Sequence, residues 1–211
     1  GYTMSFLAAY LYDKVMAETE AACLQQWRES LLNGLSGRIL EIGAGTGANL
    51  PFYNLKQVEL TLCEPDAIMR KQLIGKIHDQ QLTSITVSTD GAEVIQAESN
   101  SMDYVVSTLV CCSVTDLNAS LIEIKRILKP GGKFVFLEHV AAPSGTGRRR
   151  WQNIINPVWR KLAGNCHLNR NTQQAILEAG FSIESIESES MRKAMALVRP
   201  TIRGIAVNTV N

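Results

Sequence analysis

The stretch Leu40-Glu41-Ile42-Gly43-Ala44-Gly45-Thr46-Gly47-Ala48 decides the fold of this chain. The apolar residues up to Ile42 predict a β-strand, and the glycines at 43, 45 and 47 predict a sharp turn directly after it. Glycine adopts positive φ readily and lets the backbone approach a ligand closely. Such a turn between a strand and a helix is typical of α/β proteins that bind a nucleotide-like cofactor.

Glu41 indicates which cofactor this is, because it lies two residues before the first glycine. A dinucleotide would place its diphosphate against the turn and the helix start, where anions are favoured, and Glu41 would repel it. S-adenosylmethionine is a nucleoside without phosphate that carries an ammonium and a sulfonium group, which a carboxylate attracts. Gly43-x-Gly45-x-x-Ala48 also fits the dinucleotide pattern, so a nicotinamide-dependent oxidoreductase is the alternative. We expect S-adenosylmethionine, bound by Glu41, Gly43, Ala44, Gly45, Thr46, Gly47 and Asn49.

A second strand, Glu59–Cys63, ends in Glu64-Pro65-Asp66. An acidic residue about 20 positions beyond the glycine turn, at the end of the next strand, commonly accepts hydrogen bonds from ribose hydroxyls. We therefore place Glu64, with Pro65 beside it, at the ribose and expect Asp66 to cap the next helix. The alternative for Glu64 is a solvated carboxylate at the helix start.

Strand and helix patterns alternate along the rest of the chain, which predicts a mostly parallel sheet with right-handed crossovers. Ligands bind such sheets at the carboxyl ends of the strands. We expect 35–211 to form the cofactor domain and 1–34 a helical cap, which either lies over the cleft through Tyr10 and Tyr12 or packs on the sheet. The expected strands are Arg38–Ile42, Glu59–Cys63, Ser84–Ser88, Tyr104–Thr108, Lys133–Glu138, Phe181–Glu189 and Arg203–Thr209, and the expected helices are 4–33, Ala48–Phe52, Ala67–His78 and Leu117–Leu128.

Several motifs carry a family resemblance: Glu41-x-Gly43-x-Gly45-x-Gly47, Glu64, Ala92-Glu93, Met102-Asp103 and Leu128-Lys129-Pro130-Gly131-Gly132. Over residues 35 to 140 the chain resembles class I S-adenosylmethionine-dependent methyltransferases. The resemblance implies a Rossmann-like α/β fold, with a seven-stranded, mostly parallel sheet, an antiparallel last strand and helices on both faces. It also implies that Thr108 and Leu109 contact the cofactor. In the family an Asp precedes Ala-Glu and takes the adenine amino group; Gly91 stands there, so we expect backbone contacts at Gly91 and Ala92, with Asp90 as the alternative.

A narrower resemblance rests on Thr108–Val114, Leu137–Ala142 and Val198-Arg199-Pro200. These segments are similar to methyltransferase-like proteins that methylate alkyl thiols at the endoplasmic reticulum, and to their bacterial relatives. The resemblance implies a small, apolar thiol acceptor. Similar sequences methylate quinone precursors or phospholipid headgroups, and a regulatory protein that binds S-adenosylmethionine without catalysis is a third alternative. The resemblance would imply a hydrophobic N-terminal anchor; we see none in the printed sequence, and we therefore do not expect the membrane location to carry over.

The acceptor side is expected after the fifth strand and in the loop after the fourth. A thiol with a pKa near 8.5 is partly ionised at neutral pH and needs little activation. His139 is the candidate general base and Glu138 the residue that orients it, the alternative being a histidine that only closes the strand end. The candidate pocket residues are Cys111, Cys112, His139, Trp151 and His167.

Composition limits the partners. The net charge of +1 disfavours a general nucleic-acid surface, and a small-molecule acceptor is expected instead. The five cysteines show no metal-ligand spacing, so we expect reduced thiols and no metal. No apolar stretch is long enough to span a membrane, which favours a cytoplasmic protein. Residues 148–162 combine an arginine run with apolar residues at helical spacing, either a lid that touches a membrane surface or a core-facing helix. The sequence does not specify an oligomeric state.

Overall fold

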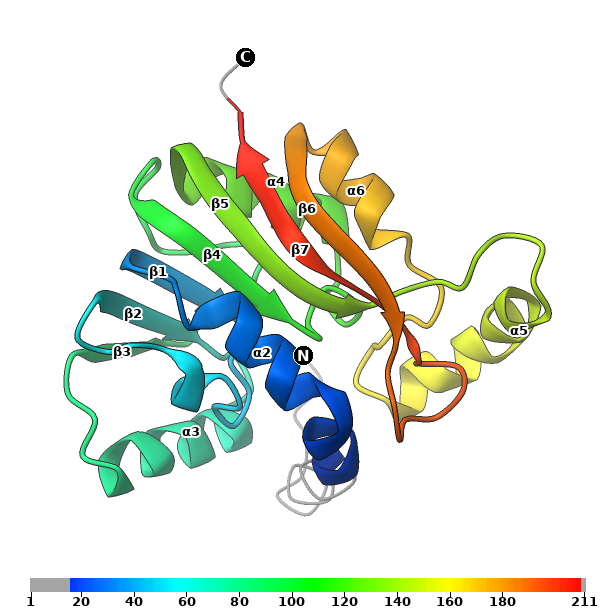
Figure 1. Cartoon of the computed structure of the whole chain (residues 1–211), viewed down its shortest axis with the longest axis horizontal. Helices are drawn as coiled ribbons and strands as arrows, with labels where there is room; N and C mark the ends of the chain where they lie inside the picture. The colour runs from blue at the N-terminus through cyan, green and yellow to red at the C-terminus, as the bar shows by residue number, and fades with distance from the viewer. Residues whose placement is uncertain (1–15, 210–211) are drawn as a thin grey trace.

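A single seven-stranded sheet organises the molecule, with strand order β3-β2-β1-β4-β5-β7-β6. The computed structural model describes residues 16–209 (Figure 1). The first five strands run parallel, and β7 pairs antiparallel with both β5 and β6. The expected Rossmann-like sheet with an antiparallel last strand is confirmed. The strands are β1 (Gly37–Ile42), β2 (Val58–Cys63), β3 (Ile85–Ser88), β4 (Met102–Thr108), β5 (Leu128–His139), β6 (Phe181–Ser190) and β7 (Pro200–Asn208).

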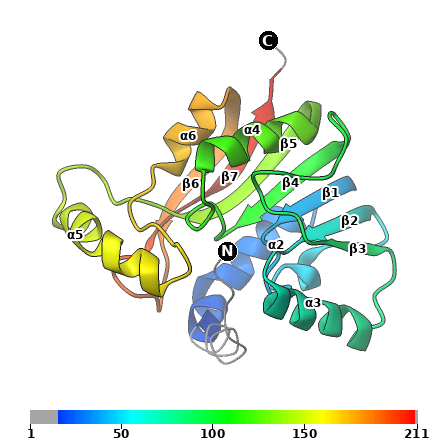
Figure 2. The same cartoon turned by 180° about the vertical axis from the view of Figure 1, so that it is seen from behind.

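Helices cover both faces of this sheet, as Figures 1 and 2 show from opposite sides. One face packs against α2 and α3, and the other against α4 and α6. The helical elements are the π-turn η1 (Glu20–Leu24), α2 (Gln25–Leu32), the 3₁₀ turn η2 (Leu50–Phe52), α3 (Ala67–Asp79), α4 (Leu117–Ile127), α5 (Gly147–Leu162) and α6 (Thr172–Glu178). The segment Ala48–Phe52, expected to start a helix that Pro51 interrupts, forms only the short η2 turn. Proline at its start supports a short turn, but its ring prevents the regular hydrogen-bond pattern of a longer helix.

The side chains of each strand alternate between these two faces, which divides the core into two layers. Leu40, Val105 and Phe136 belong to the layer under α4 and α6. Ile39 and Val106 belong to the layer under α2 and α3. This alternation, with a period of two, matters for the site because neighbouring residues at a strand end point to opposite faces.

The helical segment before β1 is anchored on the sheet rather than standing apart from it. Cys23, Leu24 and Trp27 pack against Leu137 of β5 and Met191. Tyr10 and Tyr12, the two candidate contacts in the N-terminal segment, lie outside the described residues. Within 16–209, the helices are all too short or too polar to cross a membrane.

Candidate cofactor and acceptor site

The glycine turn lies at the switch point of the sheet, where β1 stands between β2 and β4 and the strand order reverses. Gly43 and Gly45 both have a φ of +57°. A Cβ on Gly43 would lie 2.6 Å from Cγ2 of Val110, whereas a Cβ on Gly45 would meet nothing within 4 Å. Gly43 therefore packs closely against the loop after β4, whereas space remains beside the backbone of Gly45. The open side is where a cofactor can approach the backbone.

Glu64 faces this turn from the end of β2. Its Oε2 accepts a hydrogen bond of 2.7 Å from the Gly45 amide, and its Oε1 accepts one of 2.8 Å from the Asp66 amide. Burial raises the pKa of Glu64 above its ordinary value, and the two amides oppose that rise. A carboxylate can accept about four hydrogen bonds, so these two amides leave capacity for a ribose diol. Asp66 caps α3 through the amides of Ile68 and Met69, as predicted.

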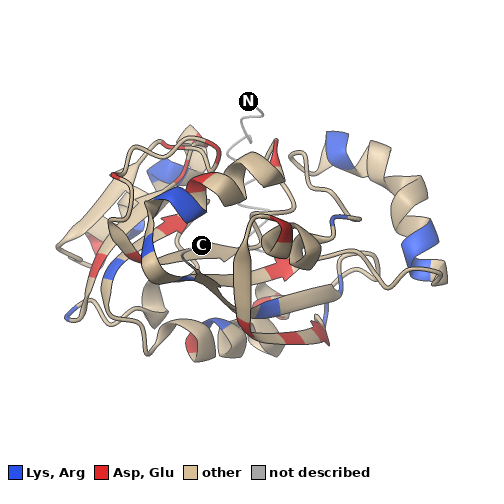
Figure 3. Ribbon diagram, turned by 90° about the horizontal axis from the view of Figure 1, so that it is seen from above, with Lys and Arg blue, Asp and Glu red and all other residues tan. Residues whose placement is uncertain are grey.

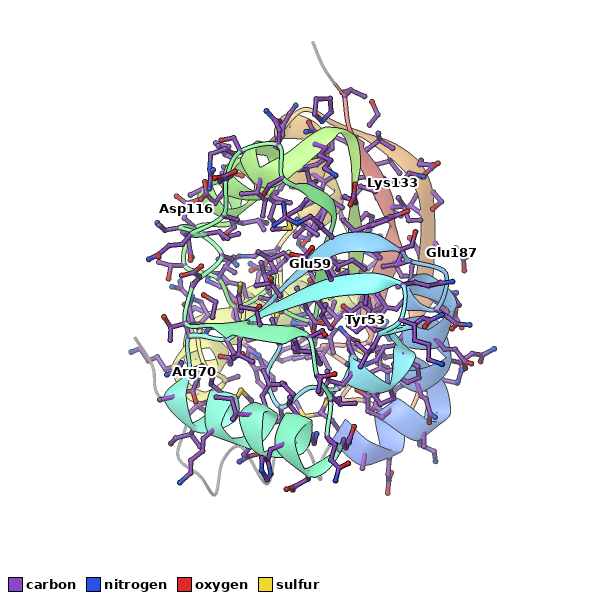
Figure 4. The ribbon with its side chains drawn as sticks, turned by 90° about the vertical axis from the view of Figure 1, so that its left-hand side faces the viewer. Tyr53, Glu59, Arg70, Asp116, Lys133 and Glu187 are labelled. Atoms are coloured by element: carbon purple, nitrogen blue, oxygen red, sulfur yellow. The ribbon has the colours of Figure 1, made fainter. Side chains whose placement is uncertain are left out.

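Glu41 lies behind the turn, where it is 2% exposed. Its Oε1 accepts a hydrogen bond from Nδ2 of Asn49 at 2.9 Å, and its Oε2 accepts one from the Tyr53 hydroxyl at 2.6 Å. Figure 4 views the molecule from the β3 edge and labels Tyr53. Burial raises the pKa of Glu41 to about 7, against the opposing effect of these hydrogen bonds. Glu41 therefore holds Asn49 and Tyr53 from the buried side of the turn, and Asn49 lies between Glu41 and the expected cofactor position.

Arg28 completes this network and was missed by the sequence reasoning. The residue is 4% exposed on α2. Its Nη1 donates hydrogen bonds to Oδ1 of Asn49 at 2.7 Å and to Oγ1 of Thr108 at 2.8 Å. Asn49 also donates to Oγ1 of Thr108 at 3.0 Å. The missed signal is a charged residue on an apolar helix face, since Arg28 falls four residues after Leu24 and four before Leu32.

The expected adenine side follows β3. Oδ2 of Asp90 accepts a hydrogen bond from the Gln96 amide at 2.9 Å, so the side chain closes a local turn. Gly91 bridges to Val94, and Ala92 is 7% exposed. Oε1 of Glu93 accepts a hydrogen bond from the Thr115 amide at 2.7 Å. The Asp90 side chain is thus engaged in this turn, and backbone contact with adenine at Gly91 and Ala92 stays a prediction.

Glu138 and His139 diverge at the end of β5, because adjacent residues of a strand point to opposite faces. Glu138 is fully buried; it accepts hydrogen bonds from the Ser107 hydroxyl at 2.5 Å and from the Cys111 amide at 3.1 Å. The expectation that Glu138 orients His139 is therefore corrected. Glu138 instead fixes the loop after β4, and burial raises its pKa.

His139 meets two cysteines from distant loops. Its Nε2 lies 3.0 Å from Sγ of Cys166, and ligand atoms of Cys112, His139 and Cys166 all lie within 4.8 Å of one another. Sγ of Cys111 lies instead 3.4 Å from the Ser107 hydroxyl, deep in the core. The structure thus brings Cys112 and His139 together as predicted, adds Cys166, and places Cys111 behind them.

His167 lies beside this cluster, in the loop between α5 and α6. Its amide donates a hydrogen bond of 2.8 Å to the Cys112 carbonyl. Burial and the neighbouring Arg170 and Arg160 lower the pKa of His167 to about 4, so its imidazole is neutral at physiological pH. The predicted position at the acceptor side is consistent with this contact.

Trp151 lies at the protein surface, and its place in the acceptor pocket stays a prediction. It is 57% exposed on α5, on the same helix face as Ile154, Val158 and Leu162. Gln152, the next residue, is fully buried; it accepts a hydrogen bond from the Ala142 amide and donates to the Leu197 carbonyl. The helix therefore docks through polar residues and leaves an apolar row outside.

Comparison with known proteins agrees with this geometry. A family described as "Methyltransferase domain" matches residues 40–136. Human thiol S-methyltransferase TMT1A is 35% identical over 201 residues, which cover 93% of this chain and 81% of the relative. The ubiquinone/menaquinone biosynthesis C-methyltransferase UbiE of Rickettsia rickettsii is 28% identical over 153 residues, which cover 66% of this chain and 62% of that relative. Phosphoethanolamine N-methyltransferase 2 of Haemonchus contortus, solved with S-adenosylmethionine, has a TM-score of 0.68 at 17% identity, over 98% of this chain and 58% of that one.

The fold, the open glycine turn and the acidic residue after β2 define a class I S-adenosylmethionine-dependent methyltransferase. The chain belongs to the methyltransferase family that includes TMT1A. S-adenosylmethionine is accordingly its cofactor, and the nicotinamide alternative is set aside.

Proposed function

We propose that this enzyme methylates the sulfur of a small, apolar thiol. The observation that carries the proposal is the cluster of Cys112, His139 and Cys166 at the carboxyl ends of β4 and β5, on the edge that also carries the glycine turn. The 35% identity to a protein named thiol S-methyltransferase supports the same acceptor class.

The residues around the turn fit the cofactor. Gly45 leaves open space beside the backbone, Glu64 keeps hydrogen-bonding capacity for ribose hydroxyls, and the Gly91–Ala92 backbone is proposed to hold adenine. Arg28 is paired with Glu20 through Nε and Nη2, and its Nη1 holds Asn49 and Thr108 beside the proposed cofactor position. The other proposed contacts of the cofactor are Ala44, Thr46, Pro65 and Leu109. Glu41 supports Asn49 from behind, and an ammonium group bound nearby would favour the ionised form of this buried carboxyl.

Little chemical activation is needed at the acceptor. When bound, S-adenosylmethionine would supply a methyl group on a sulfonium: the acceptor sulfur would gain the methyl and lose its proton, and S-adenosylhomocysteine would leave. The protein contributes mainly alignment and exclusion of water, since holding reactants in line removes much of the barrier. We propose that His139 acts on the acceptor rather than on the cofactor, beside Cys112 and His167.

Two other acceptors correspond to the reactions named for UbiE and for the phosphoethanolamine enzyme. A quinol ring or a headgroup amine would have to be deprotonated before attack, and an amine needs a site for its cation. The described acceptor edge presents soft sulfur and imidazole groups instead: Cys112 and Cys166, beside His139 and His167. This composition favours a thiol.

A panel of alkyl thiols, phenols, quinols and amines, each incubated with methyl-labelled S-adenosylmethionine, tests the acceptor class. The proposal expects label in the thiol products and background levels in the others. Preferential labelling of a quinol or an amine would overturn it. Binding of S-adenosylmethionine with no labelled product from any class would support the regulatory alternative.

We also propose that α5 contacts an anionic membrane surface. The exposed side chains of Trp151, Ile154, Val158 and Leu162 form one apolar row, with exposed fractions of 57%, 57%, 60% and 81%. Arginines and lysines lie at both ends of the helix (Figure 3). An apolar row flanked by cations is typical of helices that lie in a lipid interface.

Sedimentation with vesicles of phosphatidylcholine, with and without phosphatidylserine, tests this contact. The variant Trp151→Ser/Leu162→Ser should lose binding to the anionic vesicles. Ile122→Ser is the matched control, because Ile122 is an apolar residue 63% exposed on α4. Equal vesicle binding by both variants and the wild type would contradict the proposal.

A further inference from the structure

Three potential metal ligands converge in the fold although they are far apart in the sequence. Cys112 comes from the loop after β4, His139 from the end of β5 and Cys166 from the loop between α5 and α6. Cys112 is 3% exposed and His139 is 5% exposed. Their Sγ and ring nitrogen atoms lie within 4.8 Å of one another. The remaining cysteines within 16–209 are not part of this group.

The two loops that carry the cysteines are held together independently of the cluster. Nδ2 of Asn165 donates a hydrogen bond of 3.0 Å to the Ser113 carbonyl, and the His167 amide donates one of 2.8 Å to the Cys112 carbonyl. The Arg170 guanidinium donates to the carbonyls of Cys111 and Val114. Both cysteines are therefore positioned by the backbone, and the cluster is preorganised.

The donor set and its spacing suit a thiophilic cation. Zn²⁺ binds thiolates and imidazole in tetrahedral sites, and its bonds of about 2.0–2.3 Å hold ligand atoms roughly 3.5–3.8 Å apart. The separations here, from 3.0 Å between Nε2 of His139 and Sγ of Cys166 up to the 4.8 Å limit, bracket that range. Small movements of the side chains would bring the ligand atoms to the separations that Zn²⁺ requires.

A second observation points to a ligand at this place. Nδ1 of His139 is buried without a hydrogen-bond partner, as is Nε2 of His167. Buried polar atoms normally have partners, and each exception asks for an explanation. Coordination through Nε2, the atom beside Cys166, would leave Nδ1 unpartnered, whereas a flip of the imidazole that turns Nδ1 toward the two sulfurs would give Nδ1 the ion as its partner.

We propose that Cys112, His139 and Cys166 bind one thiophilic divalent cation of the zinc class, and that its open fourth position takes the sulfur of the acceptor. On binding, the two cysteine thiols release their protons and coordinate as thiolates, while imidazole coordinates as the neutral ring. With three protein ligands, a tetrahedral ion keeps one position for an exogenous group, as in catalytic zinc sites. The fourth-ligand role rests on the proposed thiol acceptor, whereas the cation site itself does not.

Titration of the full chain with Co²⁺, after removal of metal by a chelator and under a non-thiol reductant, tests the site. The expected result is one ion per chain, with thiolate-to-cobalt charge-transfer absorption that Zn²⁺ abolishes by displacement. Cys112→Ser and Cys166→Ser should each weaken binding by more than about tenfold, since even loss of outer residues around a metal commonly costs that much. Cys23→Ser is the matched control, because Cys23 is as buried as Cys112 but lies outside the cluster.

Absence of saturable binding by the wild type, or equal binding by all three folded variants, would overturn the site. Circular dichroism establishes that each variant is folded. Addition of an alkyl thiol should then change the cobalt spectrum, and an unchanged spectrum would overturn the fourth-ligand role. The two proposals fail separately: methylated thiol from metal-free enzyme refutes only the metal role, and a cobalt centre without thiol methylation refutes only the proposed acceptor.

Discussion

Two glycines of the turn provide a matched test of the site's geometry. Gly43 and Gly45 share a φ of +57°, but a Cβ on Gly43 would clash with Val110, whereas a Cβ on Gly45 would enter open space. Alanine at either position costs about 1–2 kcal/mol for the left-handed backbone. At Gly43 the overpacking against Val110 adds about 1–3 kcal/mol. The entropy that alanine removes from the unfolded chain, about 0.4–1 kcal/mol, is common to both variants and cancels in their difference.

Urea denaturation should therefore show Gly43→Ala to be less stable than Gly45→Ala by about 1–3 kcal/mol. Adding Val110→Ala should remove most of that difference, because the clash loses its partner. Calorimetry should show the reverse order for the cofactor: Gly45→Ala folds better, but its methyl group occupies the open side and S-adenosylmethionine binding falls. Equal stability of the two variants, or unchanged cofactor affinity of Gly45→Ala, would refute this account of the turn.

Three further predictions concern individual side chains. Glu64→Ala should weaken S-adenosylmethionine binding in calorimetry by roughly ten- to a hundredfold, since charged hydrogen bonds contribute about 1.5–3 kcal/mol, while Glu59→Ala, an exposed carboxylate of the same strand, should not. Burial raises the pKa of Glu41 from 4.5 to about 7, so this carboxyl ionises at lower pH in the unfolded chain than in the folded protein. The stability of the wild type relative to Glu41→Gln should therefore fall by roughly 3 kcal/mol as the pH rises from about 4.5 to about 7. A stability difference that stays constant in urea titrations across that range would contradict the burial argument. His139→Ala should lower turnover by at least about tenfold with nearly unchanged cofactor affinity, and unchanged turnover would remove His139 from the acceptor side.

Much of the fold could be predicted because the strands repeat simple patterns. The segments Glu59–Cys63 and Tyr104–Thr108 are apolar and short, and each lies within the observed strand. The start of β5 was missed: it begins at Leu128 rather than at the expected Lys133, because it runs through a Pro-Gly-Gly segment that is typical of a turn. Helix α6 was also missed, since its seven residues give too little periodicity.

The candidate site was predictable where one side chain and the backbone suffice. Glu64 and the glycine turn follow from position at the strand ends. The network around Glu41 did not, because Asn49 and Tyr53 bond Glu41 from the segment after the turn, and Arg28 bonds Asn49 from α2. The cysteine and histidine cluster was invisible for the same reason. Its members lie 27 residues apart along the chain, and only the folded loops bring them together.

The central claim is methyl transfer from S-adenosylmethionine to a thiol sulfur, and a single NMR measurement tests it most directly. The enzyme is incubated with S-adenosylmethionine labelled with ¹³C in its methyl group and with an alkyl thiol, at concentrations where calorimetry shows the cofactor bound. The account predicts that the label moves to an S-methyl resonance of the thiol, and that the alcohol of the same carbon skeleton stays unlabelled. Label that remains on the bound cofactor, or that appears equally on the alcohol, would contradict it.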